Sequence, residues 1–108
     1  MISKNDYNKY SDFADSGWIA LNSAYGTNYR KKCGWIIVSM STNLDTAPST
    51  GDIDVGTLPG EYRPSKEVIV REANNSGYLY VKTSGIITFR VSTGAGRWNY
   101  ATAVFPVK

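Results

Sequence analysis

The residue types needed for most enzyme chemistry are sparse in this sequence. The chain of 108 residues has no histidine and a single cysteine, Cys33. Without histidine, neither a Ser-His-Asp triad nor a Cys-His pair can form, and most zinc sites lose their usual ligand. Cys33 also lacks a second cysteine for an internal disulfide and a base to activate it, so we expect a small buried thiol. The carboxylates are the remaining candidates for catalysis or metal binding.

Two groups of carboxylates deserve weighing. Asp52 and Asp54 alternate along the chain, so on an extended backbone both point to the same side, and with Asp45 they could hold calcium, which prefers oxygen ligands. No EF-hand spacing is present, and aspartate-rich loops are more often simply solvated. Glu61 and Glu67 could act as a glycosidase pair, but nothing in their spacing selects them from the other acids. We therefore expect no catalysis, no metal ion and no cofactor.

Aromatic side chains offer a better candidate site. The chain has 8 tyrosines and 3 tryptophans, and flat rings can cover the apolar C–H faces of sugars while Asp, Asn and Arg bond the hydroxyls. A tryptophan at the start of a strand is more often a core residue than a platform. Tyr62 beside Arg63 is a further candidate, although its place before Pro64 suits bracing of a turn better. The predicted saccharide site consists of Arg97, Trp98, Asn99 and Tyr100, beside a turn at residues 94–96, with Tyr25 and Asn28.

Charge and hydropathy exclude two classes of partner. The net charge is +3, yet the only basic cluster is Arg30-Lys31-Lys32, whereas phosphate binding normally needs a basic stripe. The longest apolar run covers residues 35–38 and is far too short to span a bilayer, and no signal peptide is visible. We therefore expect neither nucleic-acid binding nor membrane insertion.

The segments that carry these residues are predicted to be strands. Aromatic and β-branched residues with many glycines, serines and threonines are typical of an all-β fold. Residues 1–16 read as a lead-in or linker, residues 17–108 as one head domain, and residues 42–54 as a long loop. We predict an antiparallel β-sandwich or a jelly-roll-like barrel. The expected strands lie at residues 18–21, 29–32, 34–41, 78–82, 86–91 and 98–107.

Alternation also predicts the register of two of these strands. A three-residue turn at residues 83–85, with Gly85 at its third position, pairs Lys82 with Ile86 and gathers the apolar side chains on one face. In residues 34–41, Ile36, Val38 and Met40 point one way. Trp35 and Ile37 point the other way, which suggests burial on both sides near the start of that strand.

One turn segment carries a resemblance. Leu58-Pro59-Gly60 ends a strand, because Pro lacks a ladder donor and Gly accepts positive φ, and Pro64 makes Arg63 extended. The run Gly56-Thr57-Leu58-Pro59-Gly60-Glu61-Tyr62-Arg63-Pro64-Ser65-Lys66 resembles a segment of C-terminal β-domains in tail proteins of phages of Gram-positive bacteria. Further similar motifs are Trp18-Ile19-x-Leu21, Tyr29-Arg30-Lys31, Gly34-Trp35-Ile36-Ile37-Val38, residues 77–88 and Val104-Phe105-Pro106-Val107.

The resemblance implies a function and a setting. Such domains form the heads of trimeric tail appendages and often recognise cell-wall saccharides of the host. We therefore expect a homotrimeric, non-catalytic receptor-binding head at the phage tail tip, in contact with other tail or baseplate proteins. The alternative is a structural baseplate or tail-fibre domain whose exposed aromatics pack against neighbouring subunits. A small glycan-cleaving enzyme, with Glu61 and Glu67 as its acids, is the third hypothesis.

Overall fold

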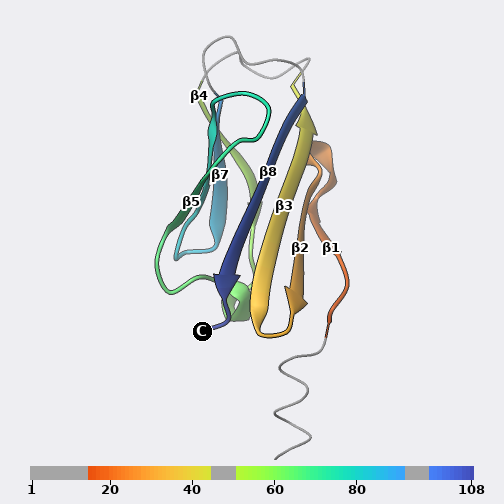
Figure 1. Ribbon diagram of the computed structural model, residues 1–108, viewed down its shortest axis with the longest axis vertical. Helices are drawn as coiled ribbons and strands as arrows, with labels where there is room; N and C mark the ends of the chain where they lie inside the picture. The colour runs from red at the N-terminus through yellow and green to blue at the C-terminus, as the bar shows by residue number, and fades with distance from the viewer. Residues whose placement is uncertain (1–14, 45–50, 92–97) are drawn as a thin grey trace, which may run out of the picture.

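The computed structural model describes residues 15–44, 51–91 and 98–108, which form two packed layers of strands (Figure 1). The predicted lead-in, the loop centre at 45–50 and the turn at 94–96 with Arg97 fall partly or wholly outside these residues. The strands are β1 (Ile19–Asn22), β2 (Thr27–Lys32), β3 (Trp35–Asn43), β4 (Gly51–Thr57), β5 (Val68–Arg71), β6 (Tyr78–Val81), β7 (Ile86–Val91) and β8 (Trp98–Pro106).

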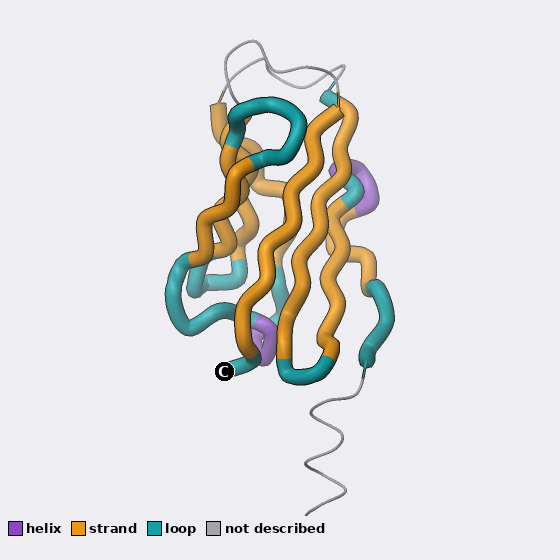
Figure 2. Tube along the Cα trace, viewed as in Figure 1, coloured by secondary structure: helices purple, strands orange, loops and turns teal. Residues whose placement is uncertain are grey.

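The two layers are four-stranded antiparallel sheets. One has the order β1-β2-β3-β8, and the other has the order β4-β7-β6-β5. The predicted antiparallel β-sandwich is therefore confirmed. Besides strands, the described residues contain two short 3₁₀ turns, η1 (Ser23–Tyr25) and η2 (Gly60–Tyr62), drawn in purple in Figure 2. None of the described residues forms a helix long and apolar enough to cross a membrane.

Strict alternation builds the core between the sheets. In β3 the side chains of Ile36, Val38 and Met40 are buried, as predicted, and in β8 every second residue from Asn99 to Phe105 is buried. Successive side chains of a strand point to opposite faces, so the intervening residues lie on the outer face of each sheet. The buried apolar residues are Tyr29, Ile36, Val38, Met40, Ile53, Val55, Leu58, Leu79, Val81, Ile87, Phe89, Val91, Ala101, Ala103 and Phe105.

The predicted register of the β6–β7 hairpin is confirmed. Val81 pairs with Ile87, and Lys82 donates its N–H to the Ile86 carbonyl (3.0 Å) across the three-residue turn. Gly85 adopts φ +91°, the conformation that this turn requires at its third position. The register therefore brings the apolar side chains of both strands to the buried face.

The turn segment after β4 packs against that hairpin. The Leu58 N–H donates to the Gly85 carbonyl (2.9 Å), and Arg63 Nε donates to the Leu58 carbonyl (3.1 Å). Arg63 is extended, as Pro64 predicts, with φ −80° and ψ 142°. The segment with the most specific resemblance therefore connects β4 to β5, the two edge strands of one sheet, and is held by the turn of the hairpin between them.

Three sequence predictions about the strands need correction. Cys33 is exposed, because it is the first residue of a two-residue turn in which Cys33 (φ 52°) and Gly34 (φ 80°) both have positive φ. Trp35 is 49% exposed, so the start of β3 is buried on one side only. The predicted loop at 42–54 is shorter, because β3 continues to Asn43 and β4 begins at Gly51.

Candidate functional site

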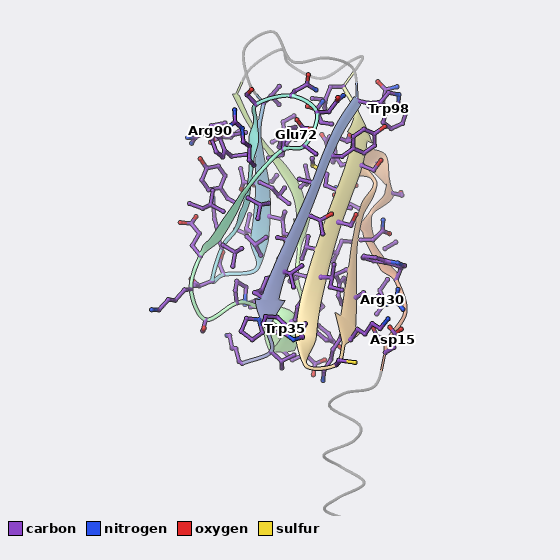
Figure 3. All side chains as sticks on the ribbon, viewed as in Figure 1. Asp15, Arg30, Trp35, Glu72, Arg90 and Trp98 are labelled. Carbon is purple, nitrogen blue, oxygen red and sulfur yellow. The ribbon has the colours of Figure 1, made fainter. Side chains whose placement is uncertain are left out.

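The most distinctive surface feature is a pair of parallel aromatic rings at the start of β8. Trp98 and Tyr100 occupy successive outward positions and are 44% and 42% exposed. Their ring centroids lie 6.1 Å apart and their planes differ by 9°, an offset-stacked arrangement. We call these two residues the aromatic pair. Trp98 projects from the upper end of the β1-β2-β3-β8 sheet, the end at which β3 stops and β8 begins (Figure 3), and Tyr100 follows two residues along β8.

Backbone pairing on both sides of β8 holds the aromatic pair in place. On one side, Trp98 pairs with Asn43 and Tyr100 with Ser41 of β3. On the other side lies the connection between β5 and β6, which we call loop 72–77. The Ala73 N–H donates to the Tyr100 carbonyl (2.8 Å), and the side-chain amides of Asn74 and Asn75 both donate to the Trp98 carbonyl (3.0 Å each). Backbone groups that would otherwise form an open sheet edge are thus occupied.

Glu72 fastens loop 72–77 to the strand. Its side chain is only 3% exposed, and its carboxylate accepts the backbone N–H groups of Asn74 (2.9 Å), Asn75 and Tyr100 (2.7 Å). A buried carboxylate is costly unless it is hydrogen-bonded, and here three donors offset that cost. With its oxygens engaged in this way, Glu72 acts as a structural clamp. Glu72 was not among the residues predicted from the sequence to form a site.

A polar hollow lies within the same loop. It has a volume of about 470 Å³ and is lined by Arg71, Glu72, Ala73, Asn74, Asn75 and Ser76. Asn74 and Asn75 line the hollow, and their side-chain amides also donate to the Trp98 carbonyl. The hollow therefore lies next to the backbone of the aromatic pair. The signal in the sequence that could have marked this hollow is the run Asn74-Asn75-Ser76, all of which have amide or hydroxyl side chains.

The other predicted saccharide residues do not join the aromatic pair. Asn99 is fully buried, since it is the inward residue between Trp98 and Tyr100, and its side-chain oxygen accepts the Asn75 amide (3.0 Å). The prediction that Asn99 contacts ligand is therefore corrected: it positions loop 72–77. Tyr25 is half-buried against the core. Asn28 bonds the Gly26 carbonyl (3.3 Å) and lies in β2, two strands from β8. Arg97 lies outside the described residues.

Tyr62 and Arg63 belong to the fold rather than to an exposed site. Tyr62 is half-buried, and its ring centroid lies 5.1 Å from that of Tyr29 in the core. Arg63 bonds the Leu58 carbonyl. This arrangement agrees with the interpretation that Tyr62 braces the turn before Pro64.

The carboxylates weighed for catalysis or calcium are dispersed. Asp52 and Asp54 do point to the same side of β4, but Asp52 pairs with Arg90 (2.9 Å) and Asp54 accepts the Thr88 hydroxyl (2.8 Å). The hydrogen bond from Arg90 lowers the pKa of Asp52 below its usual value. In the part of the chain that the structure describes, no three metal-ligating side chains gather at one point. Asp45 lies outside that part.

Two further clusters lie on the outer face of the β1-β2-β3-β8 sheet. At its β1 edge, Arg30 pairs with Asp15 and lies 5.6 Å from the ring centroid of Trp18, and its hydrogen bond holds the pKa of Asp15 well below the usual range. At the lower end, Trp35, Ile37 and Val104 form what we call the lower apolar patch. With Lys32 and Cys33 they line an open hollow of about 360 Å³.

Comparison with known proteins does not assign the chain to a family. No family model matches the chain, and no curated protein matches it. The resemblance to phage tail domains therefore stays a prediction that rests on the quoted motifs.

Proposed function

We propose that this domain is a non-catalytic receptor-binding head of a phage tail, which binds a saccharide of the host cell wall through Trp98 and Tyr100. The observation that carries the proposal is the aromatic pair. Its two large rings are exposed and parallel, whereas such side chains are normally buried for most of their surface. The motif resemblance supports the phage setting, the homotrimeric state and the place at the tail tip.

The surroundings of the pair suit a neutral polyhydroxyl ligand. Each ring offers an apolar face for the C–H side of a sugar. The side-chain oxygen of Asn74, whose amide N–H₂ bonds the Trp98 carbonyl, lies near the backbone of the pair as a hydrogen-bond acceptor. The pair is also held on a rigid strand, so little conformational entropy is lost when ligand binds. Arg97 precedes the pair in the sequence and remains a predicted contact.

The direct test is binding of the purified chain to Gram-positive cells and to extracted cell-wall polysaccharide. We expect saturable binding that Trp98→Ala weakens at least about tenfold, as removal of an aromatic anchor does in other interfaces. Trp35→Ala is the matched control, because Trp35 is about as exposed but lies at the opposite end of β3. Absence of binding by the folded protein across a broad panel of such polysaccharides would overturn the proposal.

One observation favours the structural alternative. The lower apolar patch combines Trp35, Ile37 and Val104 on a surface of the kind that subunit contacts cover. In that case the domain joins tail or baseplate subunits, and the patch is the contact. The test is the mass in solution of wild-type protein and of Trp35→Ser. A trimer that Trp35→Ser dissociates, without any saccharide binding, would favour the structural function.

A further inference from the structure

The Glu72 carboxylate already holds loop 72–77 in place, so the polar hollow in that loop serves no further purpose in the fold. Its rim carries groups with unused hydrogen-bonding capacity. Arg71 makes only a long, 3.4 Å bond to the Ser76 hydroxyl, and no carboxylate among the described residues pairs with it. Asn74 is exposed and uses its amide N–H₂ on the Trp98 carbonyl, which leaves its side-chain oxygen as an acceptor.

The hollow is preformed. The Glu72 N–H donates to the Gly77 carbonyl (2.8 Å) and closes the loop, while the Glu72 carboxylate holds the loop backbone from inside. Gly77 permits this closure, because a Cβ there would lie 2.5 Å from the Arg90 carbonyl oxygen and 2.9 Å from the Phe89 ring. A cavity whose walls are already fixed binds without the cost of ordering a loop.

The chemistry of the lining selects one class of ligand. Arg71 and Glu72 carry opposite charges, so the lining has no net formal charge, and the Asn74 side-chain oxygen and the Ser76 hydroxyl offer hydrogen-bonding groups. Ala73 is the one apolar residue of the lining. A hydroxyl-rich group fits this polar lining better than an apolar group. The volume of about 470 Å³ lies within the usual range of small-ligand sites.

We propose that the ligand is an oligosaccharide of at least two units, one on the aromatic pair and a neighbouring one in the polar hollow. This inference rests on the proposed function and adds the size of the ligand and a second subsite. The two subsites are joined through Asn74 and Asn75, whose amides contact the Trp98 carbonyl and whose side chains line the hollow. Arg71 and Ser76 are then specificity residues for the second unit.

The test uses the full chain and cell-wall polysaccharide from Gram-positive cells, cut by partial acid hydrolysis and separated into fragments of one, two and more sugar units. Dissociation constants are measured by calorimetry. We expect affinity to rise about tenfold or more between one unit and two or three units, since a second set of contacts is added.

Two variants test whether that gain in affinity comes from the hollow. Arg71→Gln removes the charged donor and Ser76→Tyr fills the rim, and both residues are exposed. We expect each to lower the affinity for longer fragments about tenfold and to leave one-unit fragments unaffected. Lys66→Gln is the control for loss of a positive charge, because Lys66 is exposed and lines a different hollow. Thermal unfolding of each variant checks its fold.

The outcomes separate the two proposals. If one-unit and longer fragments bind equally, or if neither hollow variant affects any fragment while Trp98→Ala abolishes binding, the second subsite is wrong and the proposed function stands. If the folded wild-type protein binds neither the fragments nor the parent polysaccharide, both proposals are overturned.

Discussion

Among single residues, Tyr29 links the stability of the fold to pH. Its side chain is 6% exposed, and burial, followed by the nearby Tyr62 and Glu61, raises its pKa above the ordinary value of 10.0. A group whose pKa is raised in the folded state contributes stability below its unfolded pKa and loses it as pH rises through the folded pKa. We therefore expect the free energy of unfolding to fall above about pH 10.

Tyr29→Phe tests this expectation, because it removes the ionisable hydroxyl and keeps the ring. The loss of stability between about pH 9 and about pH 11 should be smaller in the variant than in the wild type. Urea unfolding at a series of pH values measures both curves. An equally steep loss in the two proteins would show that Tyr29 makes no contribution.

The predicted site at residues 97–100 shows what a local sequence pattern can predict and what it cannot. Arg97, Trp98, Asn99 and Tyr100 were predicted as one site because they are consecutive. A strand sends alternate side chains to opposite faces, so Trp98 and Tyr100 face solvent while Asn99 enters the interior. The same alternation, applied to residues 98–107, would have separated Asn99 from Trp98 and Tyr100.

Among the elements, loop 72–77 depends on the Glu72 clamp. Glu72→Gln replaces a charged acceptor of three N–H groups by an amide with one oxygen, so we expect a loss of about 2 kcal/mol in the free energy of unfolding. Hydrogen exchange at the amides of Asn74, Asn75 and Tyr100 should also become faster. Glu67→Gln, at an exposed position, is the matched control. Unchanged stability and exchange in Glu72→Gln would contradict the clamp.

The β6–β7 turn is the second element with a specific requirement. Gly85→Ala places a Cβ at φ +91° and 2.7 Å from both the Leu58 carbonyl oxygen and Arg63 Nε. We expect a loss of about 1–3 kcal/mol in the free energy of unfolding, measured by urea. Gly60→Ala is the control, because no heavy atom lies within 4 Å of a Cβ there. A Gly85→Ala protein as stable as the wild type would mean that the turn relaxes freely.

Elements were predicted from the sequence where a local signal was present and was used, and were missed where it was absent or was not applied. The β6–β7 register follows from Gly85 and from alternation within 14 residues. Cys33-Gly34 was missed because cysteine is not a usual residue at positive φ. The start of β4 was missed although Asp52-Ile53-Asp54-Val55 alternates. The role of Glu72 depends on Tyr100, which lies 28 residues away in sequence, so no local pattern could reveal it.

For the whole molecule, three tryptophans mark three separate places on one sheet. Trp18 lies beside Arg30 at the β1 edge. Trp35 belongs to the lower apolar patch and Trp98 to the aromatic pair at the upper end (Figure 3). All three are exposed, at 51%, 49% and 44%. The competing functions assign these places to different partners: the aromatic pair to a saccharide, and the lower apolar patch to a neighbouring subunit.

The most direct test of the central claim is therefore an NMR titration of the three indole N–H signals with soluble cell-wall polysaccharide fragments. Single Trp→Phe variants assign the signals. The account predicts that the Trp98 signal shifts with saturation while the signals of Trp18 and Trp35 stay in place. A saturable shift of Trp35 with Trp98 unmoved, or no shift of any indole signal, would contradict it.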